Sequence, residues 1–210
     1  MNIAILLFDD VDLLDAGGPY EVFLTASRLV ERDGGMRPFN LTTVTLDGKP
    51  TTAYGGLGLI PHGSVEDAID ADILIVPGTI DIEATMANEQ LVSQLSAFAN
   101  NKKFDNVVAS VCTGSFLLAE AGLLVNKKCT THWEDIDLLN EKLLEKGSTT
   151  AGATRDVRWV DVGSVVTGAA LSSGIDMSLH LVERFAGIEL AQRTAKQLEY
   201  RWEKTGINDA

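Results

Sequence analysis

Three short runs of apolar residues constrain the fold of this chain most strongly. They lie at residues 2–8, 72–76 and 106–111, and they show little polar alternation. A strand with one wet face alternates polar and apolar side chains, whereas a continuous apolar run is typical of a strand buried on both faces of a parallel sheet. We therefore expect a mostly parallel sheet that is covered by helices on both sides.

Apolar residues at helical spacing separate these strands, and the first helix is expected to begin near Gly18-Pro19, with proline in its first turn. Further helices are expected at 89–100, 114–122, 132–145, 174–185 and 189–202. Other β segments are expected at 41–46, within 51–63, and as a hairpin around Gly163. This alternation predicts a doubly wound three-layer α/β sandwich of the flavodoxin-like kind, as one domain over residues 1–210.

The charge of the chain disfavours two classes of partner. Its 210 residues contain 17 Lys and Arg against 30 Asp and Glu, which gives a formal net charge of -13. Such a field repels phosphate backbones and anionic lipid surfaces, so we expect neither nucleic acid nor membrane as a partner. The first residues lack a basic segment, and no apolar run approaches the ~20 residues that span a bilayer. We therefore expect a cytoplasmic protein whose two cysteines are free thiols.

Cys112 is the strongest candidate for chemistry. The strand at 106–111 leads directly into it, and a helix is expected to begin at Gly114. A strand–turn–helix arrangement of this kind exposes a nucleophile at the carboxyl edge of a sheet, and the N-terminus of a helix lowers the pKa of a thiol. The alternative is a buried cysteine that only packs, which is the interpretation for Cys129.

A thiol nucleophile needs a partner for its proton, and Asp15 is the preferred candidate. It is flanked by apolar residues in the segment between the first strand and helix, and such surroundings raise the pKa of a carboxyl group. The alternative is that Asp15 only caps the helix. His132 opens a helix and is the second candidate, whereas His62 and His180 are interpreted as packing or surface residues. Asp9, Asp10 and Asp12 are interpreted as solvated loop charges.

Backbone donors are expected after the strand at 72–76. There, Pro77-Gly78-Thr79 reaches the same edge of the sheet, where the N–H groups of Gly78 and Thr79 can stabilise a developing negative charge. A plain turn is the alternative. The sequence contains no phosphate-binding loop, dinucleotide motif or zinc-spaced Cys/His set, so we expect no cofactor and no metal.

Together these segments resemble the ThiJ/PfpI superfamily, which has the class I glutamine amidotransferase-like fold, and within it the isocyanide hydratases and the AraC-type amidase-like branch. The resemblance extends from Met1 to about Arg201. Five segments carry it in order: Leu14-Asp15 with Gly18-Pro19, Pro77-Gly78, Ser110–Gly114, Thr130–Trp133, and Thr167-Gly168 through Gly174–Asp176.

The resemblance implies roles for individual residues. Cys112 matches the nucleophile of the family, and Asp15 matches the acidic residue that hydrogen-bonds it in isocyanide hydratases. Gly78 and Thr79 match the oxyanion donors, although the family usually has two glycines there. Thr113 matches the hydratases and departs from the peptidase-like members, which have His after the Cys. The other substrate-binding candidates are Gly114, His132, Trp133, Tyr20 and Leu171.

The chemistry implied is the hydration of a small molecule. The Cys112 thiolate attacks the terminal carbon of an isocyanide, Asp15 protonates or orients the imidate nitrogen, and water releases an N-formamide. The resemblance also implies a homodimer.

Three alternatives stay open. One is a free-standing ligand-sensing or redox-sensing domain, because related domains precede the DNA-binding part of AraC-type regulators. Only Glu203–Ala210 follow the last expected helix, so DNA binding by this chain is not expected. The other two are glyoxalase-like or deglycase-like hydrolysis and protease-like hydrolysis at the same cysteine.

Overall fold

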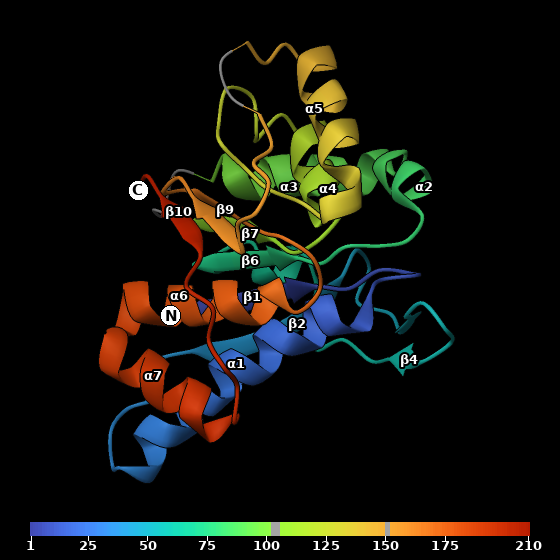
Figure 1. The fold of residues 1–210 in the computed structure, drawn as a ribbon. Helices are drawn as coiled ribbons and strands as arrows, with labels where there is room; N and C mark the ends of the chain where they lie inside the picture. Colours follow the sequence, from blue (N-terminus) through green and yellow to red (C-terminus); the bar gives the residue numbers. More distant parts are fainter. Residues whose placement is uncertain (102–105, 150–151) are drawn as a thin grey trace.

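The computed structural model describes residues 1–101, 106–149 and 152–210, and a central sheet runs through it (Figure 1). The strands of this sheet are β1 (Asn2–Leu6), β2 (Asn40–Thr45), β5 (Gly63–Ser64), β6 (Ile73–Val76), β7 (Val107–Ser110), β8 (Trp159–Asp161), β9 (Val165–Gly168) and β10 (Gly206–Asn208). Their order is β10-β8-β9-β7-β6-β1-β2-β5, and all neighbouring pairs are parallel except β8 and β9. Two short strands, β3 (Thr51–Thr52) and β4 (Gly58–Leu59), pair separately as an antiparallel hairpin. The mostly parallel sheet is confirmed.

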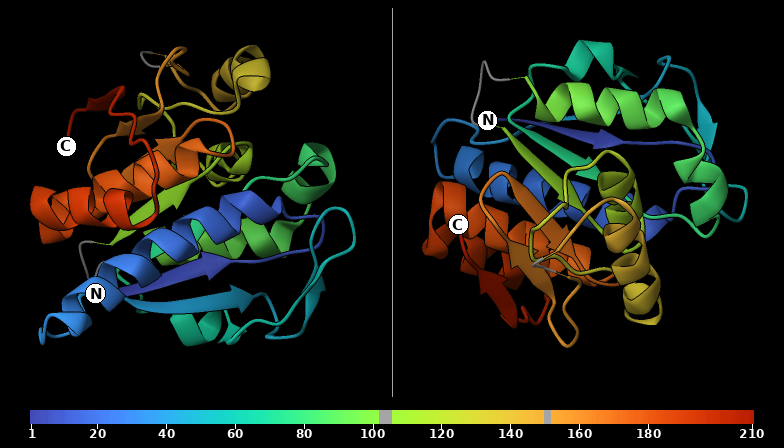
Figure 2. Two further views of the ribbon diagram at one scale, coloured as in Figure 1. Left: turned by 60° about the horizontal axis from the view of Figure 1, so that its bottom comes forward. Right: turned by 90° about the horizontal axis from the view of Figure 1, so that it is seen from above.

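Helices cover both faces of the sheet. One layer contains α1 (Leu13–Arg32), α6 (Ser173–Ala186) and α7 (Ile188–Gln197), and Figure 2 shows α1 and α6 lying side by side. The other layer contains α2 (Ile82–Met86), α3 (Glu89–Ala99), α4 (Gly114–Glu120) and α5 (Ile136–Glu145). Two 3₁₀ turns, η1 (Glu66–Ala68) and η2 (Trp133–Asp135), complete the set of helical segments in the described ranges.

Each face of the sheet has its own hydrophobic core. In β1, Ile3 and Ile5 belong to the core under α1 and α6, whereas Ala4 and Leu6 belong to the core under α3 and α4. Successive side chains of a strand point to opposite faces, so both sets must be apolar when both faces are covered. This is why the strand runs show no alternation.

The first helix begins earlier than the sequence indicated. It starts at Leu13, so Pro19 lies inside the helix and not in its first turn. Proline has no N–H to donate to the carbonyl of Asp15 four residues earlier, and the helix continues without that bond. As a result Asp15 lies in the first turn of α1, where its position is fixed by the helix and not by a loop.

The end of the chain also differs from the expectation. The last helix ends at Gln197 and not at Trp202, because Glu199 adopts a positive φ of 50°. The chain then turns back, and β10 adds a parallel strand to β8 at the edge of the sheet. The short helix α2 and strand β10 were not predicted.

The remaining elements agree with the sequence pattern within a few residues. β8 and β9 form the antiparallel hairpin, with Gly163 at a φ of +86° in the turn. α4 ends before Gly122, whose φ is +75°, and the N–H of Leu123 bonds back to the carbonyl of Leu118, as in a Schellman motif. Within the described residues, no helix is both long and apolar enough to cross a membrane.

Candidate active site at the carboxyl edge of the sheet

Cys112 occupies a strained turn between β7 and α4. Its φ is +55°, a conformation that residues other than glycine rarely adopt. The backbone N–H of Cys112 donates to the carbonyls of Ala169 at 2.8 Å and Gly168 at 3.2 Å, and its carbonyl accepts from the Thr131 hydroxyl at 3.0 Å. These bonds hold the turn in place, so the predicted strand–turn–helix geometry around Cys112 is present.

Gly114 allows this turn to approach the neighbouring strand. A Cβ at Gly114 would lie 2.3 Å from the carbonyl oxygen of Val76 and 2.7 Å from that of Pro77. Both atoms belong to the backbone and cannot rotate away. Only glycine therefore fits where the start of α4 passes the end of β6.

Asp15 brings a fully buried carboxyl group to the same edge. Oδ2 accepts the backbone N–H of Gly78 at 2.9 Å, while Oδ1 is buried without a hydrogen-bond partner among the described residues. The Cys112 thiol interacts with this carboxyl group and lowers its pKa. The structure thus brings together Cys112 from the turn after β7, Asp15 from the first turn of α1, and Gly78 from the turn after β6.

Burial controls the protonation of Asp15. Loss of solvent raises its pKa to about 7, helped by the nearby charge of Asp12 and opposed by the hydrogen bond from Gly78. A group with this pKa exchanges its proton close to neutral pH, as general acid–base chemistry requires. The raised pKa expected from the apolar flanks of Asp15 is therefore present.

The expected low pKa of the Cys112 thiol is wrong. Burial raises it to about 12, and the charge of Asp15 acts in the same direction. The backbone N–H groups of Leu171 and Thr113 lower it, but their effect is smaller than that of burial. Exposure and a low pKa are the properties that make a cysteine easy to oxidise, and Cys112 is only 5% exposed with a raised pKa, so its surroundings do not favour oxidation.

The two expected oxyanion donors already have acceptors. Gly78 donates its N–H to Asp15, and Thr79 donates its N–H to the Thr113 hydroxyl at 2.8 Å. The same hydroxyl donates to the Thr79 carbonyl at 2.7 Å. In this structure Gly78 and Thr79 therefore fix the positions of Asp15 and Thr113, and the N–H groups that act on the sulfur are those of Leu171 and Thr113.

Gly78 is as crowded as Gly114. A Cβ there would lie 2.6 Å from the Thr113 hydroxyl oxygen and 2.7 Å from Asp15 Oδ2. The turn after β6 thus needs glycine in order to contact both side chains.

Leu171 and Tyr20 are partly buried and pack against the core that contains Cys112.

His132 and Trp133 lie at the start of η2. The Nδ1 atom of His132 accepts the Glu134 N–H at 3.3 Å and lies 3.5 Å from Asp135 Oδ2, so the ring acts as an N-terminal cap. The His132 ring also acts on Asp12, where it partly opposes the rise in pKa that burial causes. Trp133 is 66% exposed and lines a cavity of about 310 Å³ together with Thr131.

The sequence interpretation missed two residues of this site. The sequence predicts a solvated loop charge at Asp12, but Asp12 is half-buried, its pKa is raised, and its charge raises the pKa of both Asp15 and Cys112. Its position three residues before Asp15 was the available signal, since residues at that spacing share one side of a helical turn. Thr131 belongs to the Thr130–Trp133 segment that carries the family resemblance, but the sequence alone assigns no role to it.

The other cysteine and histidines have structural surroundings. Cys129 is fully buried, and burial raises the pKa of its thiol to about 12. The ring of His180 stacks on Trp159 at 3.7 Å, and its Nε2 lies 2.7 Å from Asp161 Oδ2. His62 contacts the hydroxyl of Thr43 at 2.8 Å.

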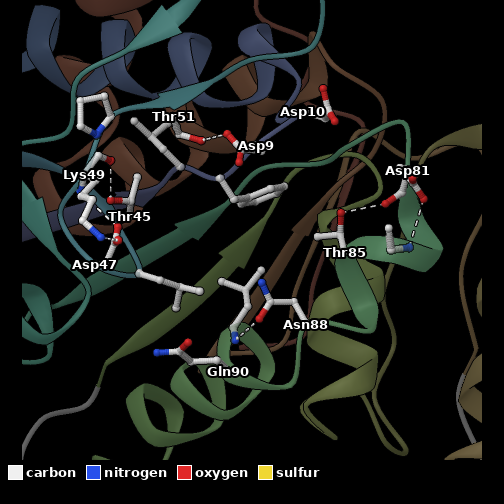
Figure 3. Close-up of a pocket in the computed structure, with 16 residues that line it drawn as sticks. Asp9, Asp10, Thr45, Asp47, Lys49, Thr51, Asp81, Thr85, Asn88 and Gln90 are labelled. Carbon is white, nitrogen blue, oxygen red and sulfur yellow. Dashed lines mark hydrogen bonds and ion pairs between the residues drawn. The ribbon is translucent and has the colours of Figure 1, made fainter.

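A separate cavity of about 550 Å³ opens beside the ends of β1 and β2 (Figure 3). Neither Cys112 nor Asp15 lines it. Several of its polar groups bond to one another: Asp9 accepts from Thr51, and Asp81 accepts from the first turn of α2. In the described ranges, no group of three or more His, Cys, Asp or Glu side chains is arranged to hold a metal ion.

Comparison with known proteins places this geometry in a family. The model of the DJ-1/PfpI family matches residues 1–184. Isonitrile hydratase from Pseudomonas putida is 35% identical over 202 residues, which cover 95% of this chain and 78% of the hydratase. The transcriptional regulator GbdR from Pseudomonas aeruginosa is 29% identical over 199 residues, which cover 95% of this chain but only 50% of the regulator.

A solved structure agrees in fold. The crystal structure of a ThiJ/PfpI family protein from Pseudomonas syringae superposes with a TM-score of 0.79 at 24% identity, covering 96% of this chain and 76% of that chain. The family model covers most of the sequence, including the turn at Cys112 and the carboxyl group of Asp15. The chain therefore belongs to the DJ-1/PfpI family.

Proposed function

We propose that residues 1–210 form a single domain that hydrates isocyanides to N-formamides, with Cys112 as nucleophile and Asp15 as proton carrier. The observation that carries the proposal is the Asp15 carboxyl group, which is buried against the thiol with Oδ1 free of other hydrogen bonds. The 35% identity to an isonitrile hydratase supports the choice of substrate class.

The first step forms a carbon–sulfur bond. The Cys112 sulfur attacks the terminal carbon of R–N≡C while its proton passes to the Asp15 carboxylate. Asp15 then returns the proton to the same carbon, which gives a thioimidate, R–N=CH–S–Cys. A thiol with a raised pKa needs such a base within reach, and Asp15 supplies it with a pKa of about 7.

The second step consumes water. Water adds to the thioimidate carbon, one of its protons reaches the nitrogen through Asp15, and the carbon–sulfur bond breaks as the second proton returns to the sulfur. The product is R–NH–CHO, and the enzyme recovers its starting state. No cofactor or metal takes part in this proposal.

The backbone around Cys112 stabilises the sulfur when it carries charge. The N–H groups of Leu171 and Thr113 are the donors that lower the pKa of the thiol. The side group of the substrate is proposed to lie against Leu171, Tyr20 and Trp133. Gly78, Thr79, Gly114 and His132 shape the site without contacting the reacting atoms.

Ligand sensing is the second candidate function. It is favoured by the 29% identity to GbdR, a transcriptional regulator that is twice as long as the matched region. A sensor binds its ligand without turnover, so it needs a cavity for the ligand but does not need the free Asp15 oxygen. Peptidase-like chemistry is disfavoured because Thr113 stands where the peptidase-like members have histidine.

The experiment that separates these functions is a turnover panel. Purified protein is mixed with an alkyl isocyanide, methylglyoxal or a peptide substrate, and the products are identified by mass spectrometry. Formamide from the isocyanide alone supports hydration. Lactate formed from methylglyoxal, or cleavage of the peptide, would mean that the thiol attacks another class of electrophile. Thermal stabilisation by a ligand that is not consumed supports sensing.

We further propose that the protein is a cytoplasmic homodimer. Exposed apolar side chains gather where the start of α1 meets the β3–β4 hairpin: Leu13 (43% exposed), Leu57 (52%) and Ile60 (83%). Leu13 and Ile60 line one shared cavity of about 250 Å³. A second copy is the occupant expected from the family, and light scattering during size exclusion tests it. A monomer mass would contradict it.

A further inference from the structure

Asp176 is a fully buried carboxylate outside the catalytic pair, and it is surrounded by donors. It lies in the first turn of α6 and accepts from Arg158 Nε at 2.7 Å and from the Tyr200 hydroxyl at 3.0 Å. The backbone N–H of Glu203 donates to its second oxygen at 2.9 Å. The ion pair with Arg158 is completed by a 2.6 Å contact from Nη2. Burying such a pair requires good geometry, so its arrangement is well defined.

The same groups hold the loop at 169–172. Arg158 Nη2 donates to the Ser172 hydroxyl at 3.0 Å, and the Tyr200 hydroxyl lies 3.3 Å from the Ser172 carbonyl. The Arg158 carbonyl accepts the N–H of Ala169 at 2.9 Å. Both ends of this four-residue loop are therefore bonded to Arg158 or Tyr200.

The loop also contacts Cys112. The Ala169 carbonyl accepts the Cys112 N–H at 2.8 Å, and the Leu171 N–H interacts with the sulfur. Arg158 is itself held by the end of the chain, because its N–H donates to the Thr205 carbonyl at 2.6 Å just before β10. A continuous set of bonds thus joins the C-terminal segment to the nucleophile.

We propose that Asp176, Arg158 and Tyr200 are positioning residues for Cys112: they hold the 169–172 loop, whose Ala169 carbonyl binds the Cys112 N–H, in its place beside the nucleophile. The proposal rests on the proposed function only in taking Cys112 as the nucleophile. Its alternative is that the network merely stabilises the fold.

The network acts on the sulfur through the loop. The titratable groups whose charges act on the thiol are Asp15 on α1 and Asp12 just before it. Asp176 and Arg158 neutralise each other as an ion pair. Loosening the network therefore withdraws a hydrogen-bond donor from the thiolate, which raises the pKa of the thiol and lowers its reactivity at any given pH.

Two conservative variants test this. Arg158→Lys keeps the charge but cannot bond Asp176 and Ser172 with a planar fork, and Tyr200→Phe removes only the hydroxyl. Arg37→Lys, in the exposed pair with Glu31, and Tyr54→Phe, on the exposed hairpin, are the matched controls. The rate of Cys112 alkylation by iodoacetamide is measured from pH 6 to pH 10, with peptide mapping to separate Cys112 from Cys129.

The expected result is a pH profile displaced to higher pH in Arg158→Lys, by about one unit, with an alkylation rate about tenfold lower at a fixed pH. Tyr200→Phe should show a smaller displacement in the same direction, and both controls should follow the wild type. Unchanged profiles in both folded variants, with only a lower melting temperature, would overturn the proposal.

Two outcomes keep the test decisive. If Arg158→Lys does not fold, the profile of Tyr200→Phe against Tyr54→Phe decides the matter. Alkylation of Cys112 does not depend on isocyanide turnover, so the two proposals can fail separately. If the wild type hydrates no isocyanide while the variants still show displaced alkylation profiles, the proposed function is contradicted and the positioning role is supported.

Discussion

The Asp15 carboxyl group accepts the backbone N–H of Gly78 at 2.9 Å, and this bond joins the first turn of α1 to the turn that follows β6. It occupies one carboxyl oxygen and leaves the other available to the thiol. Because Gly78 cannot be replaced without a clash at Asp15 Oδ2, the bond fixes where the proton carrier of the proposed reaction sits.

Replacing Asp15 should separate thiol reactivity from turnover. The charge of Asp15 raises the pKa of the Cys112 thiol, so Asp15→Asn lowers that pKa and should increase the rate of alkylation by iodoacetamide at pH 7–8. Hydration should fall, because no group then carries the proton. Asp10→Asn, at an exposed carboxylate, is the control. Slower alkylation in Asp15→Asn would contradict the assigned electrostatics.

The same substitution should change how stability depends on pH. Burial raises the pKa of Asp15 from 3.8 to about 7 in the folded state, so the native protein binds this proton more tightly than the unfolded chain. Ionising Asp15 therefore destabilises the folded state. This destabilisation is absent below about pH 4 and increases until about pH 7.

Urea unfolding of wild type and Asp15→Asn at several pH values measures this effect. The variant should become the more stable of the two as pH rises, by up to about 1.4 kcal/mol for each pH unit between the two pKa values. A constant difference from pH 4 to pH 8 would mean that Asp15 is not buried as an ionisable group.

Gly114 should tolerate no side chain. Its Cβ would lie 2.3 Å from the Val76 carbonyl oxygen, so Gly114→Ala should destabilise the fold by about 1–3 kcal/mol in urea unfolding and displace Cys112. Gly17→Ala is the matched control, because no atom lies within 4 Å of its Cβ position in α1. That change should stabilise the helix by up to about 1 kcal/mol. Equal effects at both positions would contradict the packing described.

Thr113 should matter through its hydroxyl. Thr113→Val keeps the shape of the side chain but removes the bonds to the N–H and carbonyl of Thr79, which leaves two buried backbone groups unpaired. A loss of about 1–3 kcal/mol is expected. Thr52→Val, at an exposed position in β3, should change stability little. A neutral Thr113→Val would show that the contact with Thr79 is not formed.

Much of this fold was predictable because its strands are buried on both faces. The run at 2–8 contains apolar residues for two separate cores, and such a run has few alternative structures. The helix boundaries were less predictable. Pro19 indicated a helix start, whereas α1 begins six residues earlier at Leu13 and carries the buried Asp15 in its first turn. β10 is three residues long and exists because β8 offers it an edge.

The positions of the site residues were predictable, but their electrostatics were not. The strand-to-helix turn at Cys112 and the carboxyl group of Asp15 followed from local pattern and family resemblance. The pKa of the thiol depends on burial and on the distance to Asp15, which are tertiary properties. The hydrogen bonds of the Gly78 and Thr79 N–H groups also depend on tertiary structure, since their acceptors lie 63 and 34 residues away in the chain.

Turnover of an alkyl isocyanide tests the central claim most directly. Wild type, Cys112→Ala and Asp15→Asn are compared by the loss of isocyanide and the gain of N-formamide, with Cys129→Ala as the matched cysteine control. The account predicts formamide from wild type and from Cys129→Ala, none from Cys112→Ala, and a strongly reduced rate from Asp15→Asn. Formamide production by Cys112→Ala at the wild-type rate, or none by a folded wild type, would contradict it.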